Sequence, residues 1–222
     1  MSTATETPQR QQRALQTRAQ IIRGGAKAFV KNGYEGATLA AIQKETQVSN
    51  GAFYFHFATR QSLALTVLEE YEDLVRRIVT AEASASSALE SLISASLRFS
   101  KAIKSDPIAQ AGVVLSTERS SLPERSVRQA YDVWRDQVTM ALTLAQQQGD
   151  LRDDVDVAEL SMFFVASFTG IQLASAVNTR RRDLIERVRA AWMLLLPGLV
   201  PNEHLHRMLD FVSGPAKQRT RK

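Results

Sequence analysis

The chain has 222 residues, of which 44% are hydrophobic and 23% charged, proportions that are ordinary for a soluble globular protein. It contains no cysteine, which excludes disulfide frameworks, thiolate zinc sites and cysteine nucleophiles. The N-terminal segment is polar and lacks the apolar stretch of a secretory signal. The longest apolar run, residues 162–177, is too short and too often interrupted by polar residues to span a bilayer. We therefore expect a cytoplasmic protein, with this run as a buried soluble helix.

The charge is unevenly distributed along the chain. Residues 1–62 contain eight Lys or Arg and three Asp or Glu, whereas residues 63–216 contain sixteen basic and twenty acidic residues. A basic N-terminal part followed by an acidic body is compatible with binding to a polyanion, because neutralised phosphates supply the sequence-independent part of DNA affinity. Chance clustering of charge explains the same pattern, so charge alone does not decide.

The N-terminal third predicts short helices. Residues 1–12 are polar, and we expect them to be disordered. Apolar residues recur at helical spacing from Arg13 to Asn32, and Gly33 ends this helix. Thr38 can cap a second short helix, and the compact segment NGAFYFHF follows at residues 50–57.

The remainder predicts longer helices, the first of them from Arg60 to about Ala81. Sequence signals mark further helix starts at Ser87 with Glu90, Asp106-Pro107, Asp156 with Glu159, and Asp183, with Pro197 as the stop of the last long helix. No segment of useful length alternates as a strand does. The expected fold class is therefore all-α.

Three short helices that end in FYFHF suit a helix-turn-helix. In that motif the second helix enters the DNA major groove, which favours small and polar residues at its start. Phe53 and Phe57, four residues apart, can anchor the helix to the core, while Tyr54 and His56 point elsewhere and can reach phosphates. The alternative is a generic helical hairpin in which all of these aromatic residues are core.

The segment Thr38–Leu63, TLAAIQKETQVSNGAFYFHFATRQSL, resembles the DNA-binding domain of the TetR family of repressors. Weaker matches to its γ-butyrolactone receptor subgroup are QAGVVLSTE (110–118), DVWRD (132–136), FTGIQ (168–172) and LLPGLV (195–200). The resemblance implies DNA contacts from residues between the first helix, before its apolar part, and the head of the fourth. These residues are Arg18, Thr38, Ser49, Asn50, Gly51, Ala52, Tyr54, His56 and Arg60.

The segment departs from the family pattern at four positions. Gln43 and Thr46 stand where alanine is usual, and Asn50 replaces a common lysine. Gln47 occupies the turn position that is usually glycine, so it has to adopt a left-handed conformation, at a cost of roughly 1–2 kcal/mol. We expect Gln43 to crowd two packed helices unless its side chain turns outward.

The resemblance also implies a pocket for a small-molecule effector. A tryptophan such as Trp134 would pack over a lactone ring, and a threonine such as Thr169 would hydrogen-bond to it. Core positions look the same in sequence, and the Thr169 hydroxyl can instead bond its own helix backbone. The remaining pocket residues that we predict are Gln110, Val113, Leu115, Phe164 and Phe168.

We predict four parts: a disordered arm (1–12), a helix-turn-helix DNA-binding domain (13–60), a larger helical domain for ligand binding and dimerisation (61–212), and a basic tail (213–222). A linking helix joins the two domains. The helices near 156–178 and 183–197 would pair in a homodimer, because Ala166, Gly170 and Ala174 recur every four residues and allow close approach.

The predicted function is ligand-responsive repression: a dimer binds pseudopalindromic double-stranded operator DNA and a small molecule, a γ-butyrolactone or related signalling compound, releases it. One alternative is a regulator that senses an antibiotic or another metabolite, and a second is a DNA-binding protein with no ligand. An enzyme is the rival class, but the sequence has no Gly-rich phosphate loop, no G-x-S-x-G and no H-E-x-x-H. Asp153, Asp154 and Asp156 are better explained by helix capping than by a metal, and we expect no cofactor.

Overall fold

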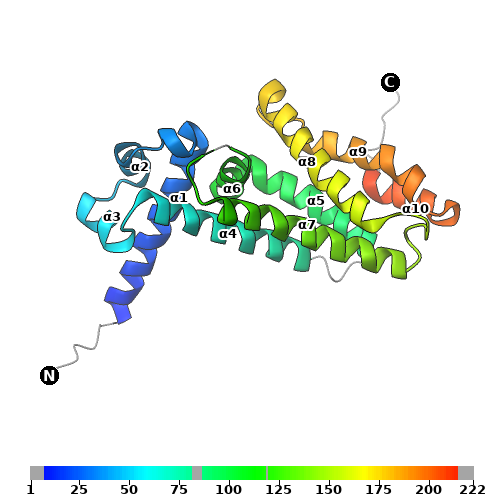
Figure 1. Cartoon of the computed structure of the whole chain (residues 1–222), viewed down its shortest axis with the longest axis horizontal. Helices are drawn as coiled ribbons and strands as arrows, with labels where there is room; N and C mark the ends of the chain where they lie inside the picture. The colour runs from blue at the N-terminus through cyan, green and yellow to red at the C-terminus, as the bar shows by residue number, and fades with distance from the viewer. Residues whose placement is uncertain (1–7, 82–86, 119, 215–222) are drawn as a thin grey trace, which may run out of the picture. The chain divides into compact units, whose positions relative to one another are not determined.

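The computed structural model describes residues 8–81, 87–118 and 120–214, and within these ranges the chain is helical with no strand, which confirms the all-α prediction (Figure 1). The basic tail and most of the N-terminal arm that the sequence predicts lie outside the described residues. Residues 8–12, expected in the arm, are instead the first turns of a helix. The described helices are α1 (Pro8–Gly36), α2 (Leu39–Thr46), α3 (Asn50–His56), α4 (Arg60–Thr80), α5 (Ala88–Ser105), α6 (Pro107–Thr117), α7 (Glu124–Gln147), α8 (Val157–Thr179), α9 (Leu184–Leu199) and α10 (Asn202–Ser213).

The chain divides into two compact units. Unit 1 comprises residues 1–73 and 106–131, and unit 2 comprises residues 74–105 and 132–222. Unit 1 therefore contains α1 to α3, the first part of α4, all of α6 and the first turns of α7. The segment 106–131 belongs by its contacts to the unit that holds the predicted helix-turn-helix, although it is distant from that motif in sequence.

In unit 1, α1 contacts α2, α3 and α6. The core of the unit is made of fully buried apolar side chains, among them Phe29, Ile42, Phe53 and Leu63. Two glycines of α1 make this packing possible, since a Cβ at Gly24 or Gly25 would lie 2.5 Å from a side-chain carbon of Thr46 or Leu63. Each glycine destabilises the helix by about 1 kcal/mol relative to alanine, and the close packing offsets this cost.

In unit 2, α9 contacts α5, α8 and α10. Trp192 of α9 is fully buried and donates its indole N–H to the hydroxyl of Ser96 on α5, at 2.9 Å. This bond satisfies the polar end of a large aromatic side chain inside the core.

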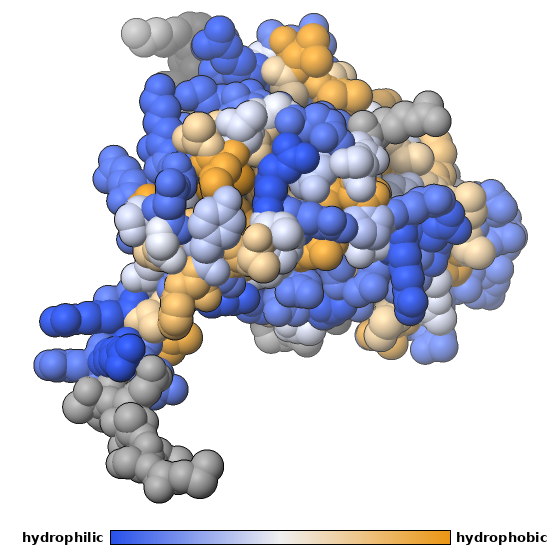
Figure 2. Space-filling model, turned by 60° about the vertical axis from the view of Figure 1, so that its left-hand side comes forward, coloured by the Kyte–Doolittle hydropathy of each residue, from blue (hydrophilic) through white to orange (hydrophobic). Residues whose placement is uncertain are grey.

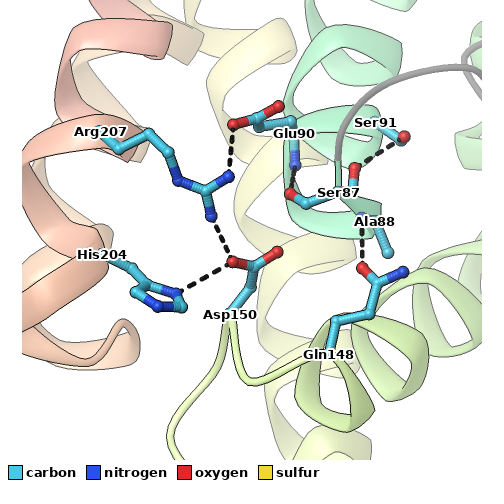
Figure 3. Close-up of polar contacts among 8 residues, drawn as sticks. All are labelled: Ser87, Ala88, Glu90, Ser91, Gln148, Asp150, His204 and Arg207. Atoms are coloured by element: carbon cyan, nitrogen blue, oxygen red, sulfur yellow. Dashed lines mark hydrogen bonds and ion pairs between the residues drawn. The ribbon is translucent and has the colours of Figure 1, made fainter.

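Helix α10 is attached to the rest of unit 2 by a polar network around two buried carboxylates (Figure 3). Arg207 donates to the carboxylates of both Glu90 and Asp150, which are 5% and 3% exposed. His204, one turn earlier, lies 3.2 Å from the same oxygen of Asp150 (Figure 3). One guanidinium therefore serves two buried carboxylates from distant parts of the chain, which makes α10 an integral part of the unit.

Most of the helix starts predicted from sequence are confirmed. Glu90 N–H bonds to Ser87, and the carboxylates of Asp106 and Asp156 accept from the first turns of α6 and α8. Gly33 interrupts α1 with a positive φ of 67°, as expected for a glycine at a helix end. These signals are local and are read correctly from a few adjacent residues.

The two ends of the last long helix differ in part from the prediction. Asp183 occupies the N-cap position of α9 as predicted, but its side chain makes no capping hydrogen bond, because its carboxylate accepts the hydroxyls of Ser175 and Thr179 and the guanidinium of Arg187 instead. Pro197 does not stop α9, which continues to Leu199. Proline lacks the N–H that would bond to the carbonyl four residues earlier and its ring crowds that carbonyl, but its fixed φ is helical, so α9 runs on for two more residues.

Helix α8 is the one described helix that is long and apolar enough to cross a membrane, and 39% of its most apolar window is buried inside the structure. The expectation of a buried helix holds for one side only. Phe164, Val165 and Phe168 are buried, whereas the apolar residues on the other side are exposed, among them Met162, Phe163, Leu173 and Val177.

Candidate DNA interface and effector site

The two short helices of the predicted DNA-binding motif are capped by side chains named in the sequence prediction. Thr38 Oγ1 accepts the N–H of Ala41 at the start of α2, and Ser49 Oγ accepts the N–H of Ala52 at the start of α3, both at 3.2 Å. A capping hydroxyl satisfies one of the free N–H groups of the first turn. Both residues are exposed, so each capping hydroxyl lies at a helix N-terminus that is accessible to solvent.

Gln47 takes the left-handed conformation that the turn requires, with φ 56° and ψ 25°. Thr46 is buried against Gly24 of α1. Gln43 lies half-buried, and its Nε2 is buried without a hydrogen-bond partner in the described part of the chain. These three of the four departures from the family pattern thus leave both helices formed, at a cost in backbone strain and one unpaired amide group.

The exposed side of α3 presents small residues and aromatic rings. Asn50 and Gly51 are exposed, and Ala52 is half-buried. A Cβ built on Gly51 meets no atom within 4 Å, so packing within the described structure does not require glycine there. Tyr54 is 55% exposed and Phe55 is 78% exposed, while Phe53 and Phe57 are buried as expected.

Phe55 is a residue that the sequence reasoning missed. An aromatic residue within a run of aromatic residues is usually interpreted as part of the core. Helical spacing, however, places Phe55 opposite the side of α3 on which Phe53 and Phe57 are buried. His56 is half-buried, with its ring edge-on to Phe55 at 5.0 Å. Tyr54 and Phe55 are therefore the large side chains that α3 presents to solvent. Figure 2, which brings the side with α1 to α3 forward, shows a mostly hydrophilic surface with small apolar patches.

Two arginines predicted to contact phosphates have partners inside unit 1. The guanidinium of Arg18 lies over the ring of Phe57, 5.4 Å from its centroid. Arg60 donates to the backbone carbonyl of Glu35 at 2.9 Å and pairs with its carboxylate at 3.4 Å. Hydrogen bonds from Ser121, and then the charge of Arg60, hold the pKa of Glu35 below its usual value.

The predicted effector residues fall into both units. Trp134, Phe164, Thr169 and Phe168 belong to unit 2, whereas Gln110, Val113 and Leu115 lie on α6 in unit 1. Val113 and Leu115 are buried, and Gln110 is half-buried.

In unit 2 the aromatic residues form one cluster. Phe99 lies 5.0 Å from Trp134 and 5.6 Å from Phe168, and Trp134 lies 5.7 Å from Phe168, measured between ring centroids. Phe164 continues the cluster to Trp192 at 4.9 Å. The Thr169 hydroxyl donates to the carbonyl of Val165 at 2.8 Å, which is the alternative partner considered from sequence. Phe99 was not predicted, because a lone phenylalanine in an amphipathic helix has no distinguishing signal.

A groove of about 620 Å³ runs along α8 and α9 in unit 2. It is lined mainly by apolar and small residues, and a Cβ at Gly170 would meet nothing within 4 Å. The groove opens beside the exposed apolar residues of α8 and Leu194 of α9, which is 82% exposed. The groove and the exposed apolar side chains beside it thus form an apolar surface on this side of α8 and α9, a feature that commonly marks an interaction site.

The acidic cluster considered as a metal site is used structurally. Arg152 pairs with Asp154, and Asp156 caps α8. In the described ranges no three histidine or carboxylate side chains gather as metal ligands.

Comparison with known proteins gives two family matches. Residues 21–67 match the model described as bacterial regulatory proteins, tetR family, and residues 86–201 match a tetracyclin repressor-like C-terminal domain. Among curated proteins, the A-factor receptor protein of Streptomyces griseus is 32% identical over 190 residues, which cover 86% of this chain and 66% of that protein.

Solved structures agree with the sequence comparison. A crystal structure of a gamma-butyrolactone receptor (ArpA-like protein) is 31% identical with a TM-score of 0.78, and the alignment covers 90% of this chain and 96% of that one. CprB from Streptomyces coelicolor, solved in complex with its biological operator sequence, is 30% identical with a TM-score of 0.74 over the same shares. These relatives are DNA-binding regulators rather than enzymes.

Proposed function

Because the chain belongs to the TetR family of bacterial transcriptional regulators, we propose that it is a cytoplasmic repressor that binds operator DNA as a homodimer and is released by a small molecule. The family assignment made from the Thr38–Leu63 segment is confirmed by these matches, and its relatives include receptors for γ-butyrolactones. The observation that carries the proposal is the exposed, capped helix α3.

Helix α3 suits insertion into a major groove. Its N-terminal turn carries Asn50, Gly51 and Ala52, and Gly51 has empty space where a side chain would lie. Glycine is unfavourable in a helix, so a glycine that the packing does not need is best explained by close approach of something else, here the DNA backbone. The proposed contacts remain those predicted from sequence, with Phe55 added on the exposed side of α3 as a group that can contact a thymine methyl.

Gly51→Ala tests this role. We expect the variant to fold with an unchanged or slightly higher melting temperature, because Ala is the better helix former. Its operator affinity, measured by fluorescence anisotropy on DNA from upstream of its own gene, should fall at least tenfold, about 1.4 kcal/mol. Unchanged operator affinity in a folded G51A protein would remove the groove assignment for α3.

The exposed sides of α8 and α9 are proposed as the dimer interface. Small residues Ala166, Gly170 and Ala174 and the neighbouring apolar side chains would be covered by the same helices of a second copy. Phe163→Glu should shift the protein from dimer to monomer in sedimentation velocity. Met140→Glu, at a comparably exposed position on α7, is the matched control and should remain dimeric.

The proposed effector is a γ-butyrolactone-type or related signalling compound that enters the aromatic cluster around Trp134. Aromatic faces and a threonine hydroxyl suit a small ring with hydrogen-bond acceptors. Gln110, Val113 and Leu115, which the sequence also predicts as effector contacts, lie on α6 in unit 1 and stay a prediction from sequence. Coupling requires the effector to bind the DNA-incompetent state more tightly, by about 2.7 kcal/mol for a 100-fold loss of DNA affinity.

Trp134→Ala separates this proposal from its alternatives. If the variant keeps its DNA affinity but lactones and culture extracts no longer release the DNA, the result supports the receptor proposal. Release of the wild-type protein by an antibiotic but not by lactones favours a regulator for another metabolite. A wild-type complex that no compound releases favours a DNA-binding protein without a ligand, which is consistent with Thr169 having an internal partner.

A further inference from the structure

The last turn of α1, which follows Gly33, is held by two carboxylates within unit 1. Glu118, at the end of α6, accepts the backbone N–H of Tyr34 at 3.0 Å. Glu35 accepts the backbone N–H of Ser121 at 2.8 Å. Gly33 makes room for the first contact, because a Cβ there would lie 2.5 Å from an oxygen of Glu118. Each of the two segments thus supplies one carboxylate that accepts a backbone N–H of the other.

Arg60 is attached to the same turn. One of its terminal nitrogens donates to the Glu35 carbonyl at 2.9 Å, the other pairs with the Glu35 carboxylate at 3.4 Å, and the guanidinium lies 4.3 Å over the ring of Tyr34. Both terminal nitrogens therefore already have an acceptor. The Arg60 and Glu35 side chains are 28% and 53% exposed, so this pair remains accessible to an approaching anion.

Resting on the proposed binding of operator DNA, we propose that Glu35 is a positioning residue that competes with the DNA backbone for Arg60. A phosphate that binds Arg60 through the terminal nitrogen now paired with Glu35 has to compete with that carboxylate, whose other oxygen accepts the Ser121 N–H. The like charge of Glu35 also repels a phosphate that approaches Arg60. Both effects make operator binding weaker than the basic residues of the motif would otherwise allow.

This competition has a consequence for release. A repressor with restrained affinity needs less differential binding energy from its effector to leave the DNA. The restraint is specific to phosphate contacts, so it appears in the salt dependence of binding rather than only in the affinity. Each phosphate neutralised steepens the plot of log K against log salt by about 0.9.

The experiment is a salt series of operator binding by anisotropy with the full-length chain. Glu35→Gln keeps an acceptor for the Ser121 N–H but removes the charge. We expect it to bind about three- to tenfold more tightly at fixed salt, with a slope steeper by about 0.9. The double variant E35Q/R60Q should show neither the tighter binding nor the steeper slope when it is compared with R60Q alone. Glu124→Gln, which breaks another exposed Glu–Arg pair of the same unit on α7, is the matched control and should leave the slope unchanged.

Two results would overturn the inference. An E35Q slope equal to that of the wild type means that Arg60 is not released to a phosphate. Gains that persist in E35Q/R60Q mean that the effect of Glu35 does not pass through Arg60. If the wild-type chain binds no operator at low salt, the proposed function fails as well, so the two failures are distinguishable.

Discussion

Gly24 of α1 and Thr46 of α2 are in direct contact: a Cβ on Gly24 would lie 2.5 Å from Thr46 Cγ2 and 2.9 Å from its Cα. Thr46 is almost completely buried, and its carbonyl accepts the side-chain amide of Gln20. The backbones of α1 and α2 therefore approach each other closely at this point, and the glycine also leaves room for the Thr46 methyl group.

Gly24→Ala should therefore destabilise the protein despite the better helix propensity of alanine. We expect a loss of about 1–3 kcal/mol from overpacking, measured by chemical denaturation. Gly51→Ala, whose added methyl group meets no atom, is the control and should not lower stability. Equal stability of G24A and the wild type would mean that α1 and α2 separate without cost.

Gln47→Gly should stabilise the protein. Gln47 has a positive φ, which costs a non-glycine residue about 1 kcal/mol or more, and its side chain is exposed. After the greater backbone entropy of unfolded glycine is subtracted, we expect a gain of about 0.5–1 kcal/mol. Gln47→Ala should give no such gain, and the two variants compared by urea denaturation decide whether the conformation or the side chain matters.

Local signals were sufficient for much of the fold. Thr38, Ser87 and Asp156 act on N–H groups two or three residues away, so their roles as caps follow from spacing alone. Asp183 fits the same pattern but is bound by Ser175 and Thr179 of the preceding helix, a competition that spacing does not reveal.

The site was less predictable than the fold, because its polar contacts join distant residues. Arg60 was expected on a phosphate, and its observed partner Glu35 is 25 positions away. The bond between Tyr34 and Glu118 spans 84 positions. The aromatic character of α3 was visible in sequence, but which ring remains exposed depends on how α3 packs on the core.

Asp183 should make stability depend on pH in the acid range. Hydrogen bonds from Ser175, then Thr179, and the Arg187 guanidinium hold the pKa of Asp183 well below its usual value. A depressed folded-state pKa contributes stability above the unfolded pKa of about 3.9, and that contribution is lost as the pH falls through the folded value.

Asp183→Asn removes this titration. We expect the variant to be less stable than the wild type at pH 7, and the difference to shrink as the pH falls below about 4. Thermal melts between pH 2 and pH 7 measure it. A stability difference that stays constant across this range would show that the Asp183 charge is not what the hydroxyls stabilise.

Arg207→Met should strongly destabilise unit 2. The substitution keeps most of the apolar stem but removes the charge that the buried carboxylates of Glu90 and Asp150 share. Breaking a buried ion pair on one side costs about 3–5 kcal/mol, and we expect the lower end because Arg207 is partly exposed. His206→Ala, a neighbouring position that is almost fully exposed, should have no effect in the same denaturation experiment.

The shared guanidinium also bears on how this sequence can diverge. Glu90, Asp150 and Arg207 come from three distant segments, and replacing the arginine alone leaves two buried carboxylates without the guanidinium that they share. During evolution the arginine can therefore be lost only if the acidic residues change with it, or if all three are exchanged for apolar residues. Among homologous chains, these three positions should therefore covary as a set, and the loss of the arginine should mark chains in which α10 packs differently.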